Sequence, residues 1–226
     1  MAASTLALSS FPAAAQVTVE ASVQSDLRDR GYSRSGERPV ASVSLGYDDP
    51  SGFYLGAAAH GTVREGEPAL VGIQGSFGYA VRLSPGLSLD AGLARSEYQA
   101  SFTGGRDYHY TEAYLGLTTR NFSARAFYSP DYYWPDMSTL YVQLDGGLEI
   151  TPSWRANAHI GTLNYLDRPP SFVERHQFDW RFGLSRQLGD YGLHLDLSGR
   201  LKGGSYYVRG RKYEKAAVVV GISRAF

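Results

Sequence analysis

The side chains that could perform acid–base or metal chemistry are few and widely separated in this sequence. The chain has five histidines and no cysteine, which excludes disulfides and thiolate metal sites. No histidine lies in an H-E-x-x-H or other metal-ligand spacing, and no G-x-S-x-G motif marks a hydrolase nucleophile. We therefore expect no enzyme, no cofactor and no metal site. The histidines are His60, His109, His159, His176 and His194.

Charged side chains recur at every second position near the N-terminus. If a strand continues through them, Asp26, Arg28 and Arg30 project to the same side as Glu20. Opposite charges on one wall could create a transverse field that orients passing solutes. The alternative is a buried Asp–Arg pair that fixes the register of the strands. In either case, the glycine at position 31 permits a sharp exit from the strand into a loop.

Alternation with a period of two dominates the chain after Gln16. Leu193, Leu195 and Leu197 alternate with His194 and Asp196, which is typical of a strand with one apolar and one polar face. The pattern predicts twelve strands near 17–28, 38–48, 53–63, 69–82, 87–98, 108–119, 122–129, 138–150, 154–165, 174–187, 191–202 and 214–226.

The connections between these segments alternate between short and long. Short, turn-rich connections such as 84–86 and 151–153 follow every second strand, and longer ones such as 29–37 and 64–68 lie between them. Outer-membrane barrels have tight periplasmic turns and longer external loops, and strands of about 9–11 residues cross the bilayer. We expect an all-β, antiparallel, up-and-down transmembrane barrel of about twelve strands, with both termini periplasmic.

A soluble lipocalin-like barrel or β-sandwich is the alternative fold, because both also show alternation. Those folds bury large apolar residues inside and expose the polar face to water. Here the polar face carries many Gly, Ser and Ala residues, which fits a narrow polar lumen better. The charge is balanced, with 22 Lys and Arg against 22 Asp and Glu, so no net basic field indicates nucleic-acid binding.

The polar face of the predicted strands supplies the candidate pore. Basic residues outnumber acidic ones in this set, which indicates a weak preference for anions if the pore is open. The bore of a twelve-stranded barrel is intermediate in width between that of filled eight-stranded barrels and that of sixteen-stranded barrels with an aqueous channel. The candidate pore-lining residues are Glu20, Asp26, Arg28, Arg30, Asp90, Arg125, Asp145, Arg155, His159, Arg181, His194, Asp196 and Arg200.

Both ends of the chain carry signals of export and assembly. Residues 1–15 are small and apolar and end in an A-x-A pattern, which predicts a signal peptide ahead of a barrel over 16–226. The usual basic region is missing, so a flexible N-terminus is the alternative. The last strand ends at Phe226, which resembles the signal read by the barrel assembly machinery. Aromatic residues near the predicted strand ends indicate girdles against lipid. They are Tyr47, Phe53, Tyr54, Tyr98, Tyr108, Tyr110, Tyr128, Tyr132, Tyr133, Trp134, Trp154, Tyr165, Tyr191, Tyr206, Tyr207 and Tyr213.

Several motifs resemble the TorF porin family, a proteobacterial outer-membrane group. The most specific is the opening S-D-x-R-x-R-G-x-S-x-S over 25–35, which leads into Arg38-Pro39-Val40-Ala41. Further similar segments are Gly52–Gly56, Thr111–Leu117, Tyr128–Tyr132 and Phe178–Ser185. The resemblance spans nearly the whole chain after the N-terminal segment, with departures at Leu27 and Val40. It implies a porin-like barrel in a Gram-negative outer membrane.

Passive diffusion of small polar solutes through the barrel is the function we expect. A non-conducting structural or ligand-binding barrel is the first alternative, and a lipid-modifying enzyme with Ser and His at the lipid-facing wall is the second. The expected partners are outer-membrane lipid, the barrel assembly machinery at the Phe226 strand and small polar solutes.

Overall fold

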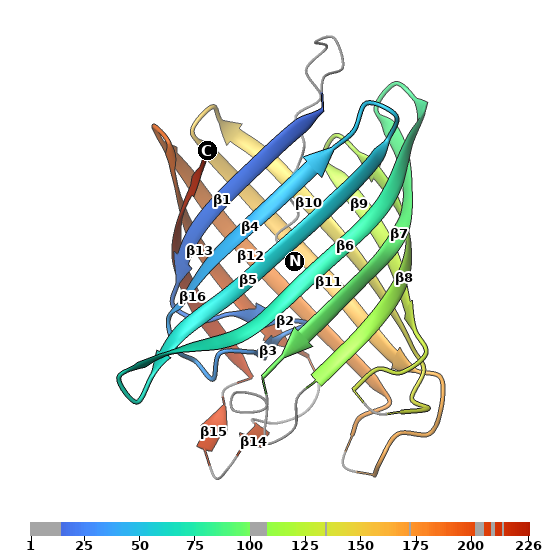
Figure 1. The fold of residues 1–226 in the computed structure, drawn as a ribbon, viewed down its shortest axis with the longest axis vertical. Helices are drawn as coiled ribbons and strands as arrows, with labels where there is room; N and C mark the ends of the chain where they lie inside the picture. The colour runs from blue at the N-terminus through green and yellow to red at the C-terminus, as the bar shows by residue number, and fades with distance from the viewer. Residues whose placement is uncertain are drawn as a thin grey trace.

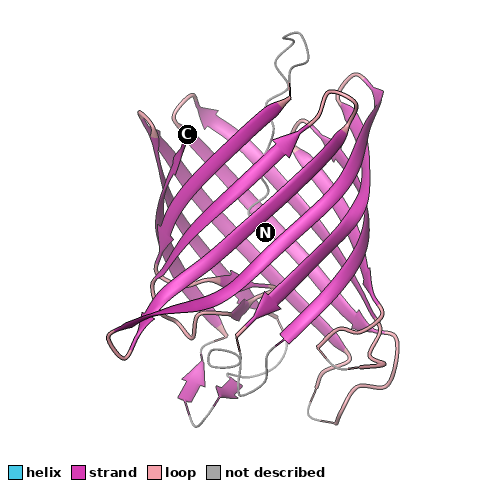
Figure 2. Cartoon of the chain, in the orientation of Figure 1, coloured by secondary structure: helices cyan, strands magenta, loops and turns pink. Residues whose placement is uncertain are grey.

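A closed antiparallel barrel of twelve strands forms the body of the molecule in the computed structural model (Figures 1 and 2). The structure describes residues 15–99, 108–133, 135–171, 173–201, 206–208, 211–213 and 215–226. The predicted signal peptide lies almost wholly outside these residues. Each strand pairs with its neighbours in sequence, and β1 closes the barrel by pairing with β16.

The strands of the wall agree with the alternation in the sequence to within a few residues at most ends. They are β1 (Gln16–Gln24), β4 (Val40–Asp48), β5 (Phe53–Arg64), β6 (Glu67–Ser84), β7 (Leu87–Tyr98), β8 (Tyr108–Thr119), β9 (Phe122–Ser129), β10 (Thr139–Thr151), β11 (Trp154–Tyr165), β12 (His176–Leu188), β13 (Tyr191–Arg200) and β16 (Ala216–Ala225). Two small hairpins lie outside this order: β2 (Arg28–Asp29) with β3 (Tyr32–Ser33), and β14 (Tyr206–Val208) with β15 (Arg211–Tyr213).

The two ends of the barrel differ. The end that carries the turns after β4, β6, β8, β10 and β12, together with the C-terminus, is the short-turn end, at the top of Figure 1. The opposite end is the long-loop end. The predicted long connection over 64–68 is wrong, because β5 and β6 extend until only Glu65 and Gly66 separate them. These two turn residues have positive φ angles, of 55° and 87°. Two residues with positive φ make a tight hairpin turn that matches strand twist.

The outer face of the wall is apolar. Leu45, Leu93 and Leu195 point outward and are 52%, 53% and 50% exposed, and similar exposed side chains recur on the other strands. A water-soluble protein rarely exposes so continuous an apolar surface, whereas a barrel in a bilayer requires one. This outward face is the lipid-facing side of a transmembrane barrel.

Among the described residues, no helix is long and apolar enough to cross a membrane.

The first predicted strand is wrong beyond Gln24. Gln24 pairs with Val40 of β4, so the wall ends there, and residues 25–39 leave it to fold across the lumen. Figure 1 shows β2 and β3 within the barrel near the long-loop end. We call residues 25–39 the lumen hairpin. The alternating charges of this segment therefore do not lie on one strand of the wall.

Candidate pore and its lumen hairpin

The structure places the predicted pore-lining residues in two groups. The wall residues share the inward phase of their strands, opposite to the exposed apolar positions. Asp26, Arg28 and Arg30 instead belong to the lumen hairpin, which is a correction to their expected place on the first strand. The inward wall residues are Glu20 on β1, Asp90 on β7, Arg125 on β9, Asp145 on β10, Arg155 and His159 on β11, Arg181 on β12, and His194, Asp196 and Arg200 on β13.

A two-residue turn forms the tip of the lumen hairpin. Arg28 pairs with Ser33 and Asp29 with Tyr32, so Arg30 and Gly31 connect the two short strands, with φ angles of 49° and 75°. This geometry requires positive φ at both positions. A Cβ on Gly31 would lie 2.4 Å from Arg200 Cγ, so the tip packs tightly against β13.

Hydrogen bonds within the hairpin converge on the buried carboxylate of Asp26. Its Oδ1 accepts from the hydroxyls of Ser33 at 2.5 Å and Ser35 at 2.8 Å. Its Oδ2 accepts from Arg28 Nη1 at 3.1 Å. Burial raises the pKa of Asp26 despite these donors, because desolvation disfavours the charged form. The S-D-x-R-x-R-G-x-S-x-S motif therefore supplies the internal hydrogen bonds of the lumen hairpin.

Arg30 connects the hairpin to the far wall. Its Nη2 donates to both carboxylate oxygens of Glu112 on β8, at 2.7 and 2.8 Å. Its guanidinium carbon lies 4.0 Å from the ring centre of Tyr141 and 5.2 Å from that of Tyr132. The ring centres of Tyr110 and Phe127 are 5.7 and 5.9 Å away. Cations are attracted to the faces of such rings, so Arg30 is held by one carboxylate and four rings.

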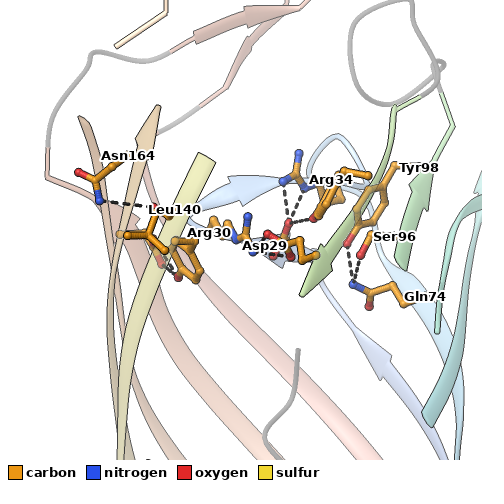
Figure 3. A network of polar contacts seen from close by, with 12 residues as sticks. Asp29, Arg30, Arg34, Gln74, Ser96, Tyr98, Leu140 and Asn164 are labelled. Carbon is orange, nitrogen blue, oxygen red and sulfur yellow. Dashed lines mark hydrogen bonds and ion pairs between the residues drawn. The ribbon is translucent and has the colours of Figure 1, made fainter. Parts of the chain in front are cut away.

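Arg34 forms a second link beside it. Its Nη2 lies 2.6 Å from Asp29 Oδ2, and its guanidinium lies 5.0 Å from the ring centre of Tyr98. Figure 3 shows Arg34 and Asp29 facing each other, with Tyr98 and its hydrogen-bond partner Gln74 on the adjacent wall. Burial alone would raise the pKa of Asp29, but the guanidinium groups of Arg34 and Arg30 hold it well below its usual range.

An aromatic cluster fills the lumen around the hairpin at the long-loop end. Tyr98, Tyr110, Tyr132 and Tyr165 are each buried in it, so the prediction that these tyrosines form a girdle against lipid is wrong. They share the inward phase of their strands, or enter from the loop after β9. Other predicted girdle residues do face outward, including Tyr47, Phe53, Tyr128 and Tyr191.

A polar cluster lies on the wall, on the short-turn side of the hairpin. His159 Nδ1 is 2.7 Å from Asp145 Oδ1, and its Nε2 is 2.9 Å from Asp179 Oδ1. Tyr141, the ring that stacks on Arg30, donates its hydroxyl to Asp179 at 3.2 Å. Carboxylates accept hydrogen bonds, so both contacts of His159 are satisfied only when both ring nitrogens carry a proton.

A small cavity separates the hairpin from this wall. Its volume is about 90 Å³, and Arg28 and Arg30 line it from the hairpin, with His159, Arg181 and Asp196 on the wall. This volume holds several water molecules. The cavity is therefore a polar chamber that Arg30 helps to line.

A third cluster lies on the adjoining part of the wall, formed by β5, β7 and β9. Arg125 Nη2 is 3.0 Å from Asp90 Oδ2, and the hydroxyl of Tyr54 donates to the same oxygen at 3.0 Å. A Cβ on Gly78 would lie 2.4 Å from Tyr54. The glycine on the inward face therefore provides the space in which a long side chain lies flat against the wall.

Sequence reasoning missed several residues of this site. Glu112 and Asp179 share the inward phase of predicted strands, with Tyr114 and Arg181 respectively, so alternation could have found them. Asp29 and Arg34 gave no such signal, because their pairing depends on the hairpin fold. No group of three or more His, Cys, Asp or Glu residues in the described part of the chain could hold a metal ion.

Comparison with known proteins gives a family and a fold. A family described as "Bacterial protein of unknown function (Gcw_chp)" matches residues 10–226. No curated protein sequence matches this chain.

The similar solved structures are outer-membrane barrels. The NanC porin has a TM-score of 0.58 at 13% identity, over 92% of this chain and 99% of that one. The KdgM porin has a TM-score of 0.56 at 11% identity, over 92% and 99%. The COG4313 outer membrane channel from Pseudomonas putida F1 has a TM-score of 0.53 at 11% identity, over 96% and 97%. At these identities the likeness shows the fold.

Proposed function

The chain belongs to the Gcw_chp family of bacterial proteins, and we propose that it is a porin-like outer-membrane channel for the passive diffusion of small polar solutes. The observation on which this proposal depends is that one closed wall has an apolar outer face and a polar inner face. The outer face is apolar, and the inner face carries Glu20, Asp90, Arg155, Arg181 and other charged side chains. A polar interior in an apolar exterior is the arrangement of a water-filled membrane pore.

The cellular placement is part of the proposal. The fold shared with NanC and KdgM porins supports the bacterial outer membrane. We propose that the short-turn end faces the periplasm, since bacterial barrels have their short turns there. A signal peptide over residues 1–15 and assembly through the strand that ends at Phe226 would bring the chain to that membrane. Membership in the TorF group, which the motif over 25–35 suggests, belongs to the same proposal.

The lumen hairpin limits what can pass. It occupies the long-loop end with buried ion pairs and rings, so the conducting path is narrower than a bare barrel of twelve strands would provide. We propose that solutes enter the polar chamber and that the hairpin selects or excludes them. This hairpin also favours a second candidate function, a non-conducting barrel that binds a ligand in its lumen. We propose no enzymatic role.

Planar-bilayer recording of the refolded full chain separates the two functions. A porin gives discrete conductance steps in salt solution, whereas a non-conducting barrel gives none. Migration on a gel with and without boiling in detergent checks that each preparation is folded. Folded protein that inserts and never conducts would exclude the channel and leave the binding barrel.

A further inference from the structure

Arg30 occupies a site that the barrel builds without it. Tyr110 and Glu112 belong to β8, Phe127 to β9 and Tyr141 to β10, and Tyr132 lies in the loop that joins β9 to β10. The rings also contact one another: the centres of Tyr110 and Tyr132 are 4.7 Å apart, and those of Phe127 and Tyr141 are 6.1 Å apart. We call these four rings and Glu112 the cation cage. Its members are held by the wall and by each other.

The fit of Arg30 in the cation cage is incomplete. Among the described residues, no acceptor forms a hydrogen bond with its buried Nη1. A free guanidinium compound could make the same carboxylate and ring contacts.

The cation cage is also adjacent to the polar chamber. The cavity between the hairpin and the wall is lined by Arg30 and by two cage rings, Phe127 and Tyr141. A solute in the chamber therefore lies beside the site that Arg30 fills. A planar cation matches this site in particular, since it can stack on Tyr141 while its N–H groups donate to Glu112.

We propose that the cation cage is a recognition site for the guanidinium group of a solute, and that Arg30 occupies it as a built-in substitute until such a solute displaces it. Displacement would release the main link between the lumen hairpin and β8. The proposal rests on the proposed channel in one respect only, because the solute reaches the cage through the lumen. Binding itself requires no conductance.

The direct test measures binding of a guanidinium compound to the folded full chain in detergent after the Arg30 side chain has been removed. Arg30→Ala leaves the cage empty, and methylguanidinium is the probe, with its neutral isostere methylurea as the matched ligand. Calorimetry or tyrosine fluorescence should show saturable binding of methylguanidinium and none of methylurea. The double variant Arg30→Ala with Glu112→Gln should weaken that binding at least tenfold, a loss of about 1.4 kcal/mol or more. Arg64→Ala, which removes an arginine beside the turn between β5 and β6, should not expose the site.

The outcomes distinguish this proposal from the channel itself. Folded Arg30→Ala protein that binds neither compound, or both equally, overturns the guanidinium site whatever the conductance. Saturable, Glu112-dependent binding by a barrel that never conducts supports the site and removes the channel. Tetramethylammonium, which cannot donate hydrogen bonds, should bind more weakly than methylguanidinium. Equal binding of the two cations would contradict a site that is specific for guanidinium.

Discussion

The lumen differs between its two ends, although one continuous wall forms both. At the long-loop end the inward positions carry large rings such as Tyr98 and Tyr110, packed against the lumen hairpin and 3% exposed. At the short-turn end the inward positions carry Glu20, Arg155 and His194, which are all partly exposed. The same alternation thus produces a packed core at one end and a polar vestibule at the other. The difference comes from side-chain size and from one inserted segment.

Replacing the lumen hairpin should reduce the difference between the two ends of the lumen more than any other change. Gln24 pairs directly with Val40, so an Asn-Gly turn in place of residues 25–39 joins β1 to β4 without moving either strand. We expect single-channel conductance to rise several-fold, because the main obstruction is gone. Unchanged conductance in a barrel that still shifts on unboiled gels would show that the hairpin does not limit the path.

Removing the charge that holds Arg30 should loosen the long-loop end. Glu112→Gln leaves a buried guanidinium without its partner carboxylate, and such a loss costs about 3–5 kcal/mol. We expect a lower denaturant midpoint and faster hydrogen exchange in the hairpin. Glu97→Gln on the neighbouring strand is the control: its carboxylate is 44% exposed, and exposed ion pairs contribute about 0–1 kcal/mol. Similar losses for both variants would argue against a docked hairpin.

The small inward residues can be tested in the same way. A Cβ on Gly161 would lie 2.1 Å from the hydroxyl of Tyr141, whereas one on Gly46 meets nothing nearer than 3.8 Å. Overpacking a closely fitted site costs about 1–3 kcal/mol. Gly161→Ala should therefore lower the thermal midpoint in detergent and Gly46→Ala should not. The reverse order would mean that Tyr141 does not lie against β11.

At the short-turn end, changes should alter selectivity rather than stability. Glu20→Gln removes an inward acidic charge from the polar vestibule, so the reversal potential in a salt gradient should shift towards anions. The free energy of unfolding should change by less than about 0.5 kcal/mol, as for other partly exposed sites. The outward Glu97→Gln serves again as the control and should leave the reversal potential unchanged. A shift of equal size there would contradict the assignment of faces.

The sequence predicts the wall well because alternation is a local property of each strand. Strand β7 is placed at 87–98 by its pattern alone, and the structure has Leu87–Tyr98. The lumen hairpin could not be found this way: Asp26, Arg28 and Arg30 alternate as a strand would, and only contacts with β8 and β13 show that they turn inward. Tyr98 is an intermediate case. It shares the phase of Asp90 and Ser96, so alternation predicts that its side chain points inward. The preference of tyrosine for membrane interfaces predicts the outward face instead.

The contrast between the two ends can be measured most directly by cysteine accessibility, because the chain has no cysteine of its own. Ser185→Cys and Ser96→Cys both place a thiol on the inward face, the first near the short-turn end and the second, 4% exposed, at the long-loop end. A polar, membrane-impermeant maleimide added to the folded protein should modify the cysteine at 185 quickly and the one at 96 very slowly. Equal rates at the two positions would contradict a lumen that is packed at one end and open at the other.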